Sequence, residues 1–184
     1  MTDAAANPLL EEWTGPFAAP PFDRIRPEHF RPAFETAIAE NKAEMEAIAS
    51  DAAPATFDNV IAALERSGEL LGRVRRVFWA LSSAHGTEGI REIEGWVSAT
   101  LTRHGSEIAH DPRLFARVHA VWEGREQAGL TPEQKRLVEN SHDRLVRGGA
   151  LLGAADKARF AEIEERLAAL SVQFGSAVAA LLFP

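Results

Sequence analysis

The sequence contains no cysteine. Its absence excludes disulfide bonds, thiolate nucleophiles and cysteine-ligated metal sites. No apolar stretch reaches the roughly 18 residues that a membrane-spanning helix needs. The first residues also show no basic segment followed by an apolar one, as a secretory signal would. We therefore expect a cytoplasmic protein that makes no membrane contact.

Positive charge is in the minority, with 20 Lys and Arg against 27 Asp and Glu, a formal net charge of −7 and a pI near 5.4. Such a surface has no net attraction for a phosphate backbone, so we expect no nucleic-acid partner. The local exception is Arg73, Arg75 and Arg76 beside Phe78 and Trp79. We interpret these arginines as ion-pairing residues on a solvated face.

Strand-like alternation and Asn-Gly or Asp-Gly hairpin turns are missing, whereas apolar residues recur every three or four positions from residue 31 onward. This pattern predicts an all-α fold, an antiparallel multi-helix bundle of about six helices. The expected helices span about 31–50, 57–84, 87–108, 112–129, 132–148 and a last one from 154. The expected N-caps are Thr56, Thr87, Asp111 and Thr131, and Gly68 and Gly72 are expected to interrupt the second helix.

Proline is concentrated at the start, where each ring fixes φ and disfavours helix. We therefore predict that residues 1–30 form an extended arm and that residues 31–184 form the helical lobe. The arm carries too many apolar side chains for a solvated tail, so we expect it to pack along a groove of the lobe. These side chains are Leu9, Leu10, Trp13, Phe17 and Phe22.

Patterns that carry catalysis are weak or missing. None of the six histidines begins a His-Glu-x-x-His zinc motif. His104, Glu107 and His110 share a helix, but the two imidazoles point about 120° apart, which favours polar residues at a fraying helix end over a metal site. The run 141–143, Ser-His-Asp, cannot form a triad because consecutive helical side chains diverge. We predict no catalytic and no metal-ligating residue, and the substrate-binding residues are unknown.

Several segments, in this order and spacing, resemble the thimet oligopeptidase family of zinc metallopeptidases. They are Asn7 to Leu10, Pro20 to Phe30, Thr56 to Ile61, Asp111 to Val118 and Ala154 to Ala158. The resemblance covers about residues 7–178 and only the N-terminal helical lobe of the family. It implies an enzyme of two helical lobes around a channel for short peptides, with the zinc and His-Glu-x-x-His in the C-terminal catalytic lobe.

The resemblance thus predicts a non-catalytic, inactive lobe that walls the channel, without a cofactor of its own, and the C-terminal catalytic lobe as its partner. After Phe174 and Gly175 the sequence departs from the family, which a truncation, a frameshift or an excised lobe would each explain. One alternative is a standalone binding or scaffold module, or self-association through the apolar Leu181, Leu182 and Phe183. Another is complementation of a separately encoded catalytic lobe.

Overall fold

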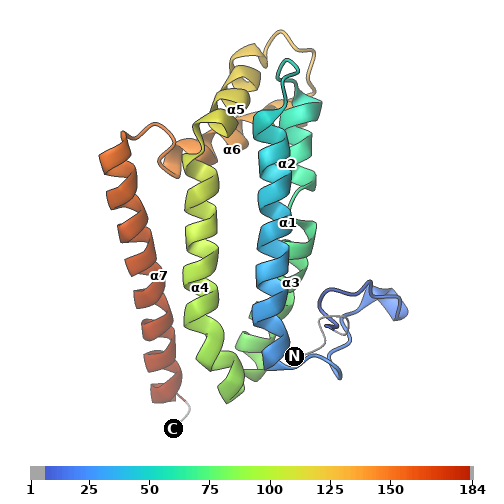
Figure 1. Ribbon diagram of the computed structural model, residues 1–184, viewed down its shortest axis with the longest axis vertical. Coiled ribbons are helices and arrows are strands. Elements are labelled where there is room, and N and C mark those ends of the chain that lie inside the picture. The colour runs from blue at the N-terminus through green and yellow to red at the C-terminus, as the bar shows by residue number, and fades with distance from the viewer. Residues whose placement is uncertain (1–6, 183–184) are drawn as a thin grey trace. The chain divides into compact units, whose positions relative to one another are not determined.

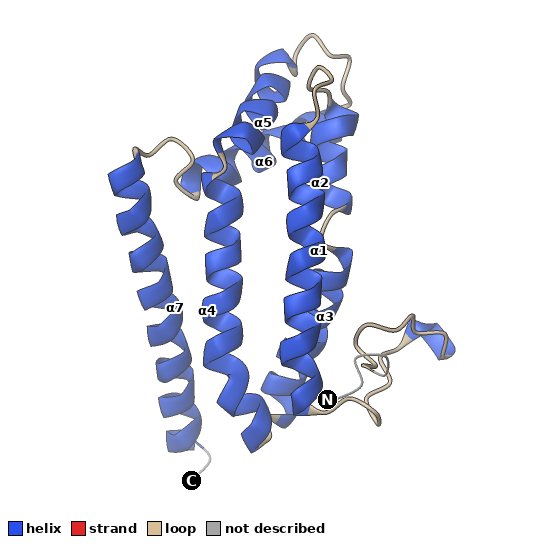
Figure 2. Cartoon of the chain, in the orientation of Figure 1, coloured by secondary structure: helices blue, strands red, loops and turns tan. Residues whose placement is uncertain are grey.

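The computed structural model describes residues 7–182, apart from a few side chains such as that of Leu182. Within these residues the chain consists of helices and loops without a strand (Figure 2), which confirms the all-α class. No helix in this range is both long and apolar enough to cross a bilayer. The expected role of Leu182 and Phe183 in self-association lies outside the described side chains.

The helices follow one another along the chain with short connections, as Figure 1 traces by colour. Short 3₁₀ turns at Pro16–Ala18 and Pro27–His29 precede them, and a π-turn at Phe57–Ile61 follows α1. The α-helices are α1 (Phe30–Ser50), α2 (Ala62–Arg66), α3 (Glu69–His85), α4 (Glu88–His110), α5 (Pro112–Gly124), α6 (Pro132–Arg147) and α7 (Ala154–Leu182).

Side-chain hydrogen bonds confirm the N-caps expected at Thr56, Asp111 and Thr131. The Asp111 carboxylate accepts from the backbone N–H groups of Arg113 and Leu114 at the start of α5. Thr131 and Gln134 form a reciprocal capping box before α6, with distances of 3.3 and 2.9 Å. These side chains satisfy backbone donors that a helix start leaves without a partner, so each boundary is set locally.

Two helix boundaries differ from those expected. The helix predicted over 57–84 is broken in two at Gly68, whose φ of +69° is left-handed, whereas Gly72 lies within α3 without a break. The helix predicted to reach Gly129 ends at Gly124, where the Arg125 side chain donates from Nη1 to the carbonyl of Trp122 at 2.6 Å; the turns that follow run to Gly129, whose φ is +65°.

The described chain divides into two compact units. The first contains residues up to 42 together with 68–97, and its core is aromatic. The Phe78 ring meets those of Phe30 and Phe34 edge-on, at centroid distances of 5.2 and 5.7 Å. Burying each of these rings contributes about 2–3 kcal/mol, so they supply much of the stability of this unit.

The N-terminal arm is fixed to the first unit most clearly at its beginning, and Ile25 near its end is buried as well. Leu9 is fully buried, the Asn7 amide donates to the carbonyl of His29 at 2.8 Å, and Arg73 donates to the carbonyl of Leu9 at 3.2 Å. The expectation that all the arm's apolar side chains are covered is wrong for Phe17 and Phe22, which are exposed. The turn around Pro16–Ala18 carries Phe17 into solvent.

The second unit contains residues 43–67 and the chain from 98 onward. Helices α5 and α6 pack on each other and on the π-turn Phe57–Ile61. The buried core consists of Ile48, Val60, Ile61, Leu114, Val118, Val121, Val138 and Leu145. This aliphatic core positions the two polar clusters described below.

Candidate functional site

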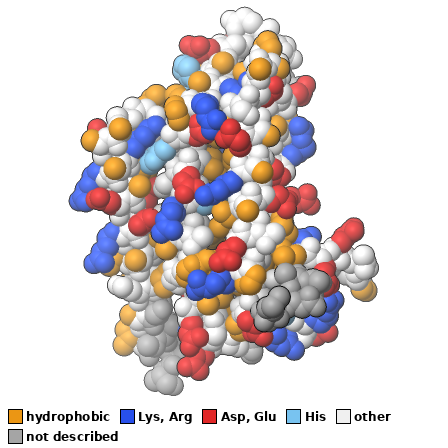
Figure 3. All heavy atoms as spheres, in the orientation of Figure 1, with side chains coloured by type: hydrophobic (Ala, Val, Ile, Leu, Met, Phe, Trp, Pro, Cys, Tyr) orange, Lys and Arg blue, Asp and Glu red, His pale blue; other side chains and the backbone are white. Residues whose placement is uncertain are grey.

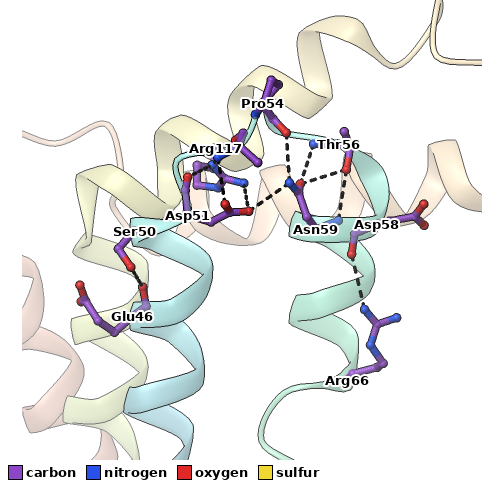
Figure 4. Close-up of polar contacts among 10 residues, drawn as sticks. Glu46, Ser50, Asp51, Pro54, Thr56, Asp58, Asn59, Arg66 and Arg117 are labelled. Carbon is purple, nitrogen blue, oxygen red and sulfur yellow. Dashed lines mark hydrogen bonds and ion pairs between the residues drawn. The ribbon is translucent and has the colours of Figure 1, made fainter.

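Arg117 on α5 is the centre of a polar network around the loop that follows α1 (Figure 4). Its Nη2 donates to the Asp51 carboxylate at 3.0 Å, and its Nη1 donates to the backbone carbonyls of Asp51 and Ala53. The Arg117 side chain is only 11% exposed. Because its nearly buried charge is matched by a carboxylate and two carbonyl groups, the guanidinium fixes the loop in place.

Asn59 holds the same loop from the other side (Figure 4). Its amide oxygen accepts from the Thr56 N–H at 2.8 Å, and its amide nitrogen donates to Pro54 O at 3.0 Å and to the Asp51 carboxylate at 3.1 Å. Thr56 was expected as an N-cap and it acts as one, since its hydroxyl accepts from the Asn59 N–H. The network is thus directed at the loop itself, which indicates a structural role.

The second cluster joins two histidines on neighbouring helices of the second unit. His119 Nδ1 on α5 lies 3.1 Å from His142 Nε2 on α6, a hydrogen-bond distance. The His142 ring stacks on Trp122 at 4.5 Å, and His119 stacks on Phe115 at 5.6 Å. The Arg125 guanidinium lies over the Trp122 ring, 4.4 Å from its centroid. We call these five residues the histidine stack.

The histidine stack disfavours protonation of His142. Burial lowers the pKa of His142 below its usual 6.5, and the neighbouring charges of His119 and Arg125 lower this pKa further. The Asp143 carboxylate, 3.8 Å from His142 Nδ1, acts in the opposite direction without overcoming the effect of burial.

The Ser-His-Asp run at 141–143 does not form a catalytic triad. Ser141 is buried, and among the described residues its hydroxyl has no hydrogen-bond partner, so it does not bond to His142. His142 Nε2 is directed to His119 instead of a serine. The divergence of consecutive helical side chains explains this arrangement.

The residues His104, Glu107 and His110 also lack the geometry of a metal site. All three lie in α4, which continues to His110. The expectation of a fraying helix end is wrong, because His104 is buried and the His110 carbonyl accepts from Lys157 on α7 at 3.2 Å. Among residues 7–182, no group of three or more His, Asp or Glu side chains could hold a metal ion.

The arginines of α3 lie beside an aromatic ring that is not open to solvent. Phe78, which would have to stack on bases, is fully buried in the core of the first unit. Within residues 7–182 the ion pair expected of Arg73 does not form; Arg73 donates to Leu9 O and lies 4.9 Å from the centre of the Trp13 ring. On the face drawn in Figure 3, basic and acidic side chains are intermixed. Arg73 therefore serves to hold the arm.

Sequence reasoning missed the histidine stack. Its two histidines lie 23 positions apart in the sequence, so only the packing of α5 on α6 brings them together. The local signal that could have indicated it is the i, i+4 and i, i+3 spacing of Phe115, His119 and Trp122 on one helix face. That signal places three rings together but does not identify His142.

Comparison with known proteins gives a clear similarity. The chain is 44% identical over 168 residues to a dipeptidyl carboxypeptidase of Escherichia coli, and 41% identical over 170 residues to that of Salmonella typhimurium. It is 28% identical over 172 residues to an oligopeptidase A of Salmonella typhimurium. No protein-family profile matches the chain. The identity to dipeptidyl carboxypeptidase, at 41–44%, is thus higher than the 28% identity to oligopeptidase A.

These matches cover 91–94% of the chain but only 25% of each relative. The chain therefore spans about a quarter of the length of the curated relatives it matches, and this quarter is the N-terminal one. The resemblance to the N-terminal lobe of the thimet oligopeptidase family is confirmed.

Proposed function

From the confirmed resemblance to the thimet oligopeptidase family, we propose that the chain is the N-terminal, non-catalytic lobe of a peptidase similar to dipeptidyl carboxypeptidase. The observation that carries the proposal is the 44% identity over 91% of this chain and 25% of the relative. The sequence has no His-Glu-x-x-His motif. Hydrolysis would then depend on the remaining three quarters of such an enzyme.

The donor groups of this chain do not fit a catalytic zinc. Such a site needs three protein ligands around one open position. The described residues offer no cluster of that size, and the imidazole nitrogens that pair between His119 and His142 face each other at hydrogen-bond distance. We therefore propose that the zinc of the full enzyme, which activates water and polarises the peptide carbonyl when bound, is held outside this chain.

In the full enzyme the chain would wall the channel that admits short peptides. The all-α architecture supports this role, because helices fixed by short capped connections form a rigid surface. The Arg117 network supports it as well, since it fixes the loop between α1 and the π-turn. The Pro-rich arm of residues 1–30 would belong to this same lobe, as its anchoring at Leu9 suggests.

Two measurements test the proposal. The purified chain, supplied with zinc, should hydrolyse no short peptide. A chimera in which the chain replaces the matched quarter of the Escherichia coli dipeptidyl carboxypeptidase should hydrolyse short peptides. Chelator-sensitive hydrolysis by the isolated chain would show that the lobe is catalytic, and a folded but inactive chimera would argue against the channel-wall role.

A second candidate function is a standalone helical binding or scaffold module without peptidase activity. The observation that favours it is a series of exposed apolar side chains on α7, of which Phe174 and Leu181 are the most exposed. Exposed apolar surfaces of this kind usually mark an interface. This alternative would be supported by two results together: an inactive chimera, and a specific partner protein that binds the isolated chain.

A further inference from the structure

Helix α7 (Ala154–Leu182) carries an apolar stripe that the described residues leave uncovered. Five large apolar side chains on it are exposed: Ile163 (43%), Leu167 (57%), Leu170 (42%), Phe174 (72%) and Leu181 (81%). Their spacing of four, three, four and seven residues keeps them within about 60° of the helix circumference, along a line of about 27 Å. We call these five residues the α7 stripe.

The α7 stripe is not the face by which α7 packs on its neighbour. The polar contact with the end of α4 comes from another side: Glu164, about 90° around the helix from the centre of the stripe, accepts from Ser106 Oγ at 2.5 Å. Phe160 lies at the edge of the stripe, about 50° from its centre, and its ring lies 6.1 Å from that of His110. The side of α7 that carries Glu164 and Phe160 is thus anchored, and the five side chains of the stripe beside it are exposed to solvent.

The geometry points to one occupant for the α7 stripe, and the argument rests on the proposed function. We propose that a helix from the remaining three quarters of the peptidase packs along it. Alternating steps of four and three residues are the spacing by which helices interlock over several turns, so a straight apolar helix fits better than a loop. Such a helix would bury the five side chains together.

The length of the relatives favours this occupant over a second copy of the chain. The match covers only 25% of a dipeptidyl carboxypeptidase or an oligopeptidase A. In each relative, the matched quarter and the other three quarters therefore belong to one polypeptide. A covalently linked segment acts at an effective concentration near the millimolar range, which a second copy reaches only in concentrated solution. The stripe would therefore be covered within one molecule.

A fluorescent dye that binds exposed apolar surface tests the proposal on the isolated chain and on the chimera described above. The isolated chain should bind the dye, and the double variant Leu167→Glu with Phe174→Glu should lose most of that signal. The matched control, Ala158→Glu with Ala169→Glu, adds the same charge at exposed positions on the opposite side of α7 and should keep the signal. Because all four positions are exposed, each variant should retain the helix content of the parent chain.

In the chimera the dye signal of the stripe should disappear. The Leu167→Glu, Phe174→Glu variant should restore dye binding and lower peptide hydrolysis about tenfold or more, because two charges would be forced into an apolar contact. Unchanged dye binding and hydrolysis in that variant would overturn the docking proposal while leaving the proposed function intact. A folded, inactive chimera in which the stripe binds no dye would contradict the proposed function but not the docking proposal.

The isolated chain and the chimera could both self-associate, and the Leu167→Glu, Phe174→Glu variant could abolish that self-association in each of them. Such a result would identify a second copy as the occupant of the stripe. That result would overturn the docking proposal. A chimera that does not unfold as one cooperative unit would count against both proposals.

Discussion

Arg117 joins α5 to the loop after α1 through one nearly buried guanidinium, so a single substitution tests the network. Arg117→Met removes its bonds to Asp51 and Ala53 and keeps most of the apolar side-chain volume. Because hydrogen bonds to charged groups contribute about 1.5–3 kcal/mol, we expect the free energy of unfolding to fall by about 2–3 kcal/mol, measured by urea denaturation.

Arg136 is the control for that substitution. Its side chain is 73% exposed and pairs with Glu139 within the same helix at 3.3 Å. Arg136→Met should change the free energy of unfolding by no more than about 0.5 kcal/mol. Equal losses for the two variants would show that burial of Arg117 adds nothing to its contribution.

His142 makes stability depend on pH in a definite direction. Its pKa in the folded chain lies below the usual 6.5 because burial, and then His119, disfavour the imidazolium. The unfolded chain therefore binds this proton more readily, and stability that is complete above pH 6.5 is lost as the pH falls through the folded pKa. The free energy of unfolding of the His142→Gln variant should therefore fall less between pH 7 and lower pH than that of the parent chain. Urea unfolding at several pH values measures this difference.

His119 allows a separate measurement of the same effect. His119→Gln removes the neighbouring imidazole, so the pKa of His142 should rise toward its usual value without reaching it, since burial is the larger cause. NMR titration of the His142 ring measures both values. A folded pKa at or above 6.5 in the parent chain would contradict this account of the histidine stack.

Between the elements, Gly68 sets the break that separates α2 from α3. Its φ is +69°, and an added Cβ would lie 3.1 Å from the side-chain nitrogen of Asn41. Side chains destabilise left-handed backbone by about 1–2 kcal/mol, so Gly68→Ala should lower the free energy of unfolding by about that amount. Thermal unfolding followed by circular dichroism measures the loss.

Gly105 gives the opposite expectation within α4. It has helical backbone, and an added Cβ would meet nothing within 4 Å. Gly105→Ala should therefore raise the free energy of unfolding by about 0.5–1 kcal/mol, because alanine loses less backbone entropy in a helix. If both substitutions lowered the free energy of unfolding, the left-handed φ of Gly68 would not explain the effect of Gly68→Ala.

The helices were predictable where their boundaries depend on local chemistry. The caps at Thr56, Asp111 and Thr131 need only residues two or three positions away, and all three form. The break at Gly68 was predicted only as an interruption, because periodicity continues across it while the backbone turns left-handed. Gly129 has the left-handed backbone expected of a helix stop, but α5 changes to turns before it, at Gly124, a change that apolar periodicity does not reveal.

The polar clusters were not predictable for a different reason. The histidine stack and the Arg117 network join residues 23 and 66 positions apart, and such contacts depend on how helices pack. The interpretation of Arg73 as an ion-pairing residue failed because its partners, Leu9 and Trp13, offer a carbonyl and a ring instead of a carboxylate. The resemblance to peptidases, by contrast, depends on sequence order alone and was confirmed.

At the scale of the whole molecule, net charge and the α7 stripe have opposite effects on the association of copies of the chain. The charge of −7 keeps copies of the chain apart near neutral pH, whereas the stripe exposes Leu167 and Phe174 to neighbours. Near the pI of 5.4 the repulsion vanishes, so we expect the isolated chain to associate there and to disperse again at higher pH. Light scattering at fixed protein concentration across pH measures this change.

The paired variants separate charge from apolar surface in that experiment. Leu167→Glu with Phe174→Glu and Ala158→Glu with Ala169→Glu add the same two negative charges, so both lower the pI equally. Only the first removes apolar side chains from the stripe, and it should scatter less than the second at every pH where the parent chain associates. If the two variants scatter alike, loss of repulsion alone drives the association, and the α7 stripe plays no part in it.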